Sequence, residues 1–197
     1  LARIFLELQT RGAENVNLVT PTHVIHPVLL ALREATREGL DLPVVYNTNG
    51  YDSLELVQAL RGVVDIYLPD LKYSEEGHAR RYSEAPGYPG VARAAIREMY
   101  RQTGPVVHEG GAARRGLIIR HLVLPDNIAG SYDALLWLKD EGMTDATLSI
   151  MRQYAPRYRA GEFPELDRRV TRKEYEDVVN YALDLGFDSI LAQGFDS

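Results

Sequence analysis

Two patterns of apolar residues alternate along this chain. Short runs of apolar and β-branched residues are each followed by apolar residues spaced three and four positions apart. The first pattern predicts strands and the second predicts amphipathic helices. Strands are predicted at 15–20, 42–46, 63–68, 117–124 and 146–151, and helices at 2–11, 28–38, 54–61, 91–102, 132–141 and 172–185.

Capping residues support several of these helix boundaries. Asp52 or Ser53 can cap helix 54–61, and Ser131 can cap helix 132–141. Thr171 and Glu174 have the spacing of a capping box for the last helix. The remaining segments predict a short helix at 74–81, a Gly-rich loop at 103–115 and a short final strand at 189–192.

Strands that alternate with helices in this way predict an α/β fold with a parallel sheet covered by helices. Only about five full strands are visible, too few for the eight of a closed barrel. We therefore expect a partial or open barrel that forms a single domain over residues 1–197.

Bulk composition excludes several classes of protein. The chain has 197 residues, 45% hydrophobic, and a net charge of −6, which argues against nucleic acid and anionic membranes as partners. No apolar stretch approaches the roughly 20 residues of a membrane span. The sequence contains no cysteine, so it holds no disulfide and no thiolate ligand for zinc or an iron–sulfur cluster.

Candidate chemistry lies where the predicted strands end, the rim at which barrel enzymes carry their active sites. Asp70 and Lys72 are two positions apart and would share one face of a strand. Together they can bind a zwitterion, with the lysine on a carboxylate and the aspartate on an ammonium group. A plain ion pair and a Schiff-base lysine are the alternative interpretations of this pair.

Other strand ends add polar side chains to the same rim. Arg120 and His121 are neighbours in one strand, so only one of them can face the barrel interior, and we favour Arg120 because a buried arginine needs an anionic partner. The further candidates are Thr20, Thr22, Asn47, Thr48, Asn49, Gln153 and Tyr154.

Five sequence motifs are spread over nearly the whole chain, at residues 12–23, 45–51, 64–73, 115–125 and 149–156. With them the sequence resembles the radical S-adenosylmethionine superfamily, specifically iron–sulfur proteins related to pyruvate formate-lyase activating enzymes. The resemblance implies a (β/α)6 partial barrel and a [4Fe-4S] cluster that reduces S-adenosylmethionine to a 5′-deoxyadenosyl radical. It also implies an electron donor, a substrate that is often a glycyl residue of a partner protein, and a cytoplasmic location.

The resemblance also implies roles for individual residues. Asp70 and Lys72 look like the Asp-x-Lys motif that contacts the methionine part of the cofactor, and Arg120 resembles the arginine near it. Thr48 and Asn49 look like part of the turn that helps bind cofactor or a monovalent cation. Gln153 or Tyr154 stands at the position near the adenosine, and Thr20 to Thr22 replaces the Gly-Gly-Glu motif of the superfamily.

The cysteine loop that holds the cluster in this superfamily follows the first barrel strand, and it is missing from this sequence. We therefore expect a partial barrel without its first strand, cut from a longer parent enzyme. We also expect the cluster ligands to lie upstream of residue 1, and the chain alone to lack radical chemistry. A cluster-free barrel that only binds a ligand, and a Schiff-base aldolase that uses Lys72, are the alternative functions.

Overall fold

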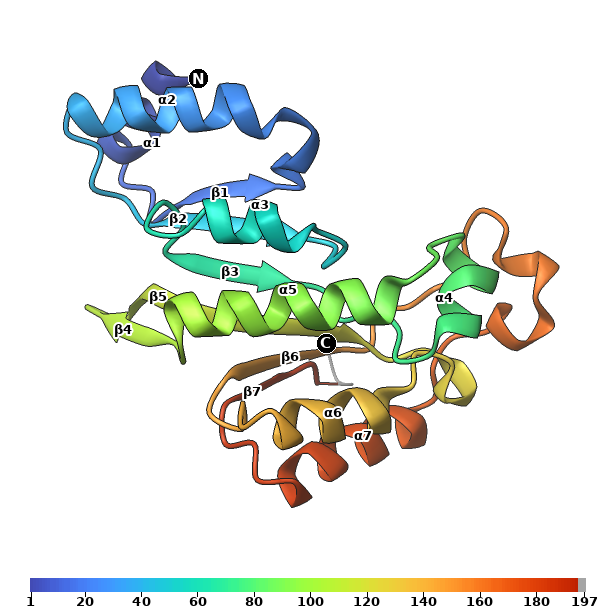
Figure 1. Cartoon of the computed structure of the whole chain (residues 1–197). Helices are drawn as coiled ribbons and strands as arrows, with labels where there is room; N and C mark the ends of the chain where they lie inside the picture. Colours follow the sequence, from blue (N-terminus) through green and yellow to red (C-terminus); the bar gives the residue numbers. More distant parts are fainter. Residues whose placement is uncertain (195–197) are drawn as a thin grey trace.

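The structure is a computed structural model, and it describes residues 1–194. Strands and helices alternate along the chain, as predicted (Figure 1). The helices are α1 (Ala2–Thr10), α2 (Ile25–Arg37), α3 (Leu54–Ala59), α4 (Glu76–Ser83), α5 (Tyr88–Thr103), α6 (Ser131–Asp140) and α7 (Arg172–Asp184). The strands are β1 (Val16–Val19), β2 (Val44–Thr48), β3 (Ile66–Pro69), β4 (Val107–Glu109), β5 (Ala112–Leu122), β6 (Thr147–Met151) and β7 (Ile190–Ala192). Four short 3-10 helices complete the order, namely η1 (Pro21–Val24), η2 (Pro125–Asn127), η3 (Ala160–Glu162) and η4 (Pro164–Leu166).

All seven strands belong to one sheet. Six of them are parallel and follow the order β1-β2-β3-β5-β6-β7, while β4 pairs antiparallel with β5. The predicted α/β class with a parallel sheet is confirmed. Within residues 1–194, β1 and β7 form the two edges of the sheet and do not pair with each other.

The segment 103–115 differs from its prediction. We expected a glycine-rich loop, but β4 and the first part of β5 form an antiparallel hairpin there. Gly110 and Gly111 make its turn, and both have positive φ. The hairpin strand β4 is exposed on every residue, so it lacks the apolar alternation by which a strand is recognised in sequence.

The sheet has one face buried under helices, and an opposite face on which apolar side chains such as Val45 and Ile66 lie beside polar ones such as Asn47. Tyr46, Tyr67, Ile119 and Ile150 alternate onto the buried face, where each is almost fully inaccessible. They join a core with residues of α3, α5, α6 and α7, and Figure 1 shows these helices flanking the strands. The opposite face of the sheet is therefore the face on which polar side chains can meet.

Two of the predicted helix caps are confirmed and one is wrong. The Ser53 hydroxyl accepts from the amide of Leu56, and Thr171 with Glu174 forms the capping box of α7. Gly130, not Ser131, is the N-cap of α6. Ser131 is the first helical residue, and its side chain is used in a contact with His121.

His121 lies on the helix-covered face of β5, opposite to Arg120, and is fully buried. Its Nδ1 is 2.6 Å from the Leu71 carbonyl oxygen and donates to it, so its Nε2 accepts from the Ser131 hydroxyl at 2.8 Å. Burial lowers the pKa of His121 to about 4. The imidazole is therefore neutral in the folded protein at neutral pH.

This pKa predicts a loss of stability in mild acid. The unfolded chain binds a proton at His121 near pH 6.5, whereas the folded chain does so only near pH 4. Stability from this residue is thus complete above pH 6.5 and is lost as the pH falls to about 4, by about 3 kcal/mol in total. We expect the free energy of unfolding of His121→Gln, measured with urea from pH 7 to pH 4, to fall less than that of the parent chain. His26→Gln, at an exposed histidine, should follow the parent chain, and an equal acid dependence for His121→Gln would contradict the assignment.

Candidate functional site

A cluster of three charged residues lies at the carboxyl end of β3. One oxygen of the Asp70 carboxylate is 2.6 Å from Lys72 Nζ, and the other is 2.7 Å from Arg120 Nε. The Asp70 side chain is 13% exposed, that of Arg120 is 25% exposed and that of Lys72 is 41% exposed. The cluster therefore carries a net charge of +1 and is open to solvent on the lysine side.

The backbone fixes these three residues together. Asp70 and Arg120 form a parallel bridge just beyond the paired residues of β3 and β5, and the amide of Leu71 donates to the Arg120 carbonyl at 2.8 Å. The amide of Asp70 donates to the Thr48 carbonyl at 2.9 Å, which joins the end of β2 to the same point. Three strand ends thus hold the cluster, and Arg120 lies on the sheet face that carries Asp70, opposite to His121.

Tyr88, the first residue of α5, supports the cluster from the side of the helices. Its hydroxyl accepts from the Lys72 amide at 2.9 Å and lies 3.0 Å from the Asn49 carbonyl and 2.9 Å from the Asp70 carbonyl. Its single proton goes to one of these two oxygens. Burial raises the pKa of Tyr88, so the hydroxyl stays protonated. Nothing in the sequence analysis indicated this residue.

Thr22 and Thr48, two of the predicted site residues, point into a buried network around Asp52. The Thr22 hydroxyl donates to Asp52 Oδ1 at 2.7 Å and contacts the Tyr46 hydroxyl at 2.9 Å, and the Thr48 hydroxyl donates to Asp52 Oδ2. Asp52 is 2% exposed. This network joins η1, β2 and the start of α3, so these two hydroxyls stabilise the rim beside the charged cluster.

Thr20, Asn47 and Asn49 lie on the same rim without reaching the cluster. The Thr20 amide donates to the Asn47 carbonyl at 2.8 Å, and Thr20 has a left-handed backbone (φ 49°) that is unfavourable for a β-branched residue. Asn47 pairs in register with Leu68, which places its side chain on the sheet face that carries Asp70. Asn49 is exposed, and its side chain accepts from the Tyr51 amide at 2.9 Å.

Gln153 and Tyr154 follow β6 at the same end of the sheet. Gln153 is exposed and accepts from Gln193 Nε2 at 3.3 Å. The Tyr154 hydroxyl donates to the Leu166 carbonyl at 2.9 Å, and its side chain lines a cavity that Lys72 also lines. The structure therefore places Tyr154 on the wall of a cavity that Lys72 also lines, and Gln153 beside Gln193, which follows the edge strand β7.

This arrangement suits a ligand that carries both charges. An ammonium group can take the place of Lys72 or Arg120 beside Asp70, and a carboxylate can meet the two cations. The Lys72 side chain is partly exposed and ion-paired to Asp70. Among residues 1–194 no three His, Asp or Glu side chains gather as metal ligands would.

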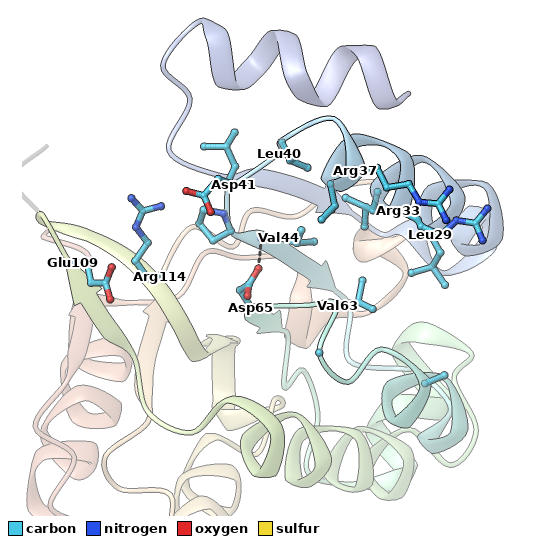
Figure 2. A pocket seen from close by; sticks show the side chains of 16 residues that line it. Leu29, Arg33, Arg37, Leu40, Asp41, Val44, Val63, Asp65, Glu109 and Arg114 are labelled. Atoms are coloured by element: carbon cyan, nitrogen blue, oxygen red, sulfur yellow. Dashed lines mark hydrogen bonds between the residues drawn. The ribbon is translucent and has the colours of Figure 1, made fainter.

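A large hollow lies at the other end of the strands. It measures about 880 Å³ between α2 and the starts of β2 and β3, and Figure 2 shows Arg33, Arg37 and Arg114 around it with acidic side chains between them. One of these, Asp65, accepts from the Val44 amide at 2.8 Å. This end of a parallel α/β sheet contributes to stability, whereas ligands bind at the carboxyl ends.

A distant relative was found among the curated proteins. The chain is 29% identical over 180 residues to the uncharacterized protein MJ0674 of the archaeon Methanocaldococcus jannaschii. The match covers 89% of this chain and 49% of that protein, so the chain spans about half the length of the curated relative it matches. No family model matches the sequence. No helix in the described part of the chain has the length and apolar character needed to cross a bilayer.

Proposed function

We propose that this chain is the cofactor-binding part of a radical S-adenosylmethionine enzyme and that it binds the methionine end of the cofactor. The observation that carries the proposal is the Lys72–Asp70–Arg120 cluster at the carboxyl ends of β3 and β5. The order of the five sequence motifs supports it, since Asp70, Lys72 and Arg120 lie in motifs that resemble those of that superfamily.

Each residue of the cluster has a part in this binding. The Asp70 carboxylate accepts hydrogen bonds from the ammonium group of the methionine moiety, while Lys72 and Arg120 bind its carboxylate. Tyr88 keeps the backbone of Asp70 and Lys72 in place through its three contacts. We extend the proposal to the architecture, in which the six parallel strands form part of a barrel that lacks its first strand.

The residues of this chain do not fit an iron–sulfur cluster. The sequence has no cysteine, and its described part has no alternative group of ligands. In the superfamily such a cluster and S-adenosylmethionine together supply a 5′-deoxyadenosyl radical. We propose that a longer protein supplies the thiolates and works in the cytoplasm with an electron donor. Its proposed reaction is hydrogen abstraction, with a glycyl residue of a partner protein as a candidate substrate.

Calorimetric titration of the 197-residue chain with S-adenosylmethionine tests the proposal. We expect saturable binding of one cofactor per chain and at least tenfold weaker binding of 5′-methylthioadenosine, which lacks the amino acid end, since loss of a charge-assisted contact costs about 1.5 kcal/mol or more. Equal affinity for the two ligands would exclude the role that we assign to the charged cluster. If neither ligand bound, the proposal that this chain binds the cofactor would be wrong. For a longer protein loaded with iron and sulfide, the expected product under reduction is 5′-deoxyadenosine.

A further inference from the structure

A second cavity opens beside the charged cluster, and the contacts proposed for the methionine end of the cofactor do not use it. It measures about 340 Å³ and lies between α4, the ends of β5 and β6, and the segment 157–166. Figure 1 shows α4 and this segment at the end of the molecule to which the strands point. Lys72 lines the cavity and is also ion-paired to Asp70, so the two sites adjoin.

The walls of the cavity are aromatic and aliphatic. Tyr73, Tyr82, Tyr154 and Phe163 line it together with Leu122. A fourth tyrosine of the lining, Tyr158, is almost fully exposed to solvent. The hydroxyls of the other three tyrosines already have partners, which are Ser83 for Tyr73, Glu165 for Tyr82 and the Leu166 carbonyl for Tyr154. These side chains therefore offer ring faces and edges to a ligand, not free hydroxyl groups, and one flat apolar group is the shape that they suit.

The charge of the lining is one-sided. It contains Lys72, Arg157 and Arg159. Among residues 1–194 no acidic residue lines the cavity, although the whole chain has a net charge of −6. Lys72 is paired with Asp70, and Arg159 is paired with Glu84 at 3.0 Å and Glu162 at 2.9 Å. Among the described residues, the Arg157 side chain has no hydrogen-bond or ion-pair partner. Its guanidinium is thus available for an anionic group at the cavity mouth.

The cavity is held open by contacts between its two walls. Phe163 meets the Tyr82 ring edge-on, with ring centres 5.1 Å apart, and the Arg81 guanidinium lies over both rings at 5.2 and 5.5 Å. Arg81 is also 2.6 Å from Glu165. These contacts fasten α4 to the segment 157–166, so a ligand meets a site that is already formed.

We infer that this cavity binds a small aromatic acid, with its ring packed against the wall that Tyr82, Phe163 and Leu122 form and its carboxylate on Arg157. The volume suits one ring with a short chain, and the unpaired cation selects the acid over neutral or cationic analogues of the same shape. Use of the cavity as a substrate pocket rests on the proposed function, but the binding itself does not.

Titration of the isotopically labelled 197-residue chain with 3-phenylpropionate, followed by NMR, tests this inference without any cofactor. We expect 3-phenylpropionate to bind about tenfold more tightly than 3-phenylpropanamide and 3-phenylpropylamine, because only the acid forms the charge-assisted contact. Arg157→Gln should remove this preference and leave the amide affinity unchanged. Arg169→Gln, at an exposed arginine of the neighbouring segment that does not line the cavity, should behave as the parent chain.

Three outcomes would overturn the inference. They are equal binding of acid and amide, no binding of either, and an acid preference that survives in Arg157→Gln. Displacement of 3-phenylpropionate by 5′-deoxyadenosine would also overturn it, because the cavity would then be the nucleoside end of the cofactor site. If S-adenosylmethionine fails to bind while the acid still does, the proposed function fails and this inference stands.

Discussion

Replacing Asp70 by asparagine is expected to weaken binding of S-adenosylmethionine to this chain by a factor on the order of 100. The carboxylate is the only group of the cluster that can accept from an ammonium ion, and its removal also leaves Lys72 and Arg120 side by side without their counterion. Removing the charge of Asp70, whose side chain is 13% exposed, is expected to cost about 3 kcal/mol of binding free energy, which corresponds to that factor. Calorimetric titration of the variant measures it directly.

The ligand series separates this effect from general damage to the fold. Binding of 5′-methylthioadenosine should be the same in Asp70→Asn and in the parent chain, because this ligand has no amino acid end. Asp184→Asn, at an exposed aspartate near the end of α7, is the matched control and should bind S-adenosylmethionine normally. An unchanged affinity of Asp70→Asn for S-adenosylmethionine, or an equal loss for both ligands, would refute the assigned contact.

Sequence periodicity was sufficient to predict most of the fold, and the exceptions have a physical reason. The parallel strands are recognisable because one face of each is buried under helices, as Tyr46 and Ile119 illustrate. The β4 hairpin strand buries nothing and therefore leaves no apolar pattern. Ser131 has the side chain of an N-cap, but His121 of β5 takes its hydroxyl, a contact between distant elements that no local rule contains.

The meeting of the three charged residues was predictable to the same extent. Asp70, Lys72 and Arg120 could be chosen because strand ends of a parallel sheet meet at one edge and opposite charges pair there. The directions in which the Thr22 and Thr48 side chains point could not be predicted. They depend on Asp52, which the sequence indicated only as a helix cap. Tyr88 and the cavity beside Lys72 arise where α4, α5 and the segment after β6 come together, and the sequence does not specify that packing.

Gly50 is the position where a single methyl group is expected to damage both the fold and the site. Its backbone is in the left-handed region (φ 80°), and a Cβ added there would lie 2.2 Å from the Asp70 carbonyl oxygen and 3.3 Å from the Tyr88 hydroxyl. The oxygen belongs to the backbone that holds the charged cluster, so the clash cannot be relieved by a side-chain rotation. We expect Gly50→Ala to lose about 3 kcal/mol of unfolding free energy, from the left-handed backbone and from overpacking together.

Gly12→Ala is the matched control for this prediction. Gly12 has the same φ of 80°, but a Cβ there meets nothing within 4 Å, so its replacement adds only the backbone cost of about 1 kcal/mol. Thermal unfolding of the two variants should therefore differ by several degrees, with Gly50→Ala the lower. Since the displaced oxygen is that of Asp70, we also expect Gly50→Ala to bind S-adenosylmethionine more weakly at a temperature where it is folded. Equal melting temperatures of the two variants would mean that the end of β3 shifts at no cost in free energy. The rigid backbone support that we assign to the Asp70 cluster would then be wrong.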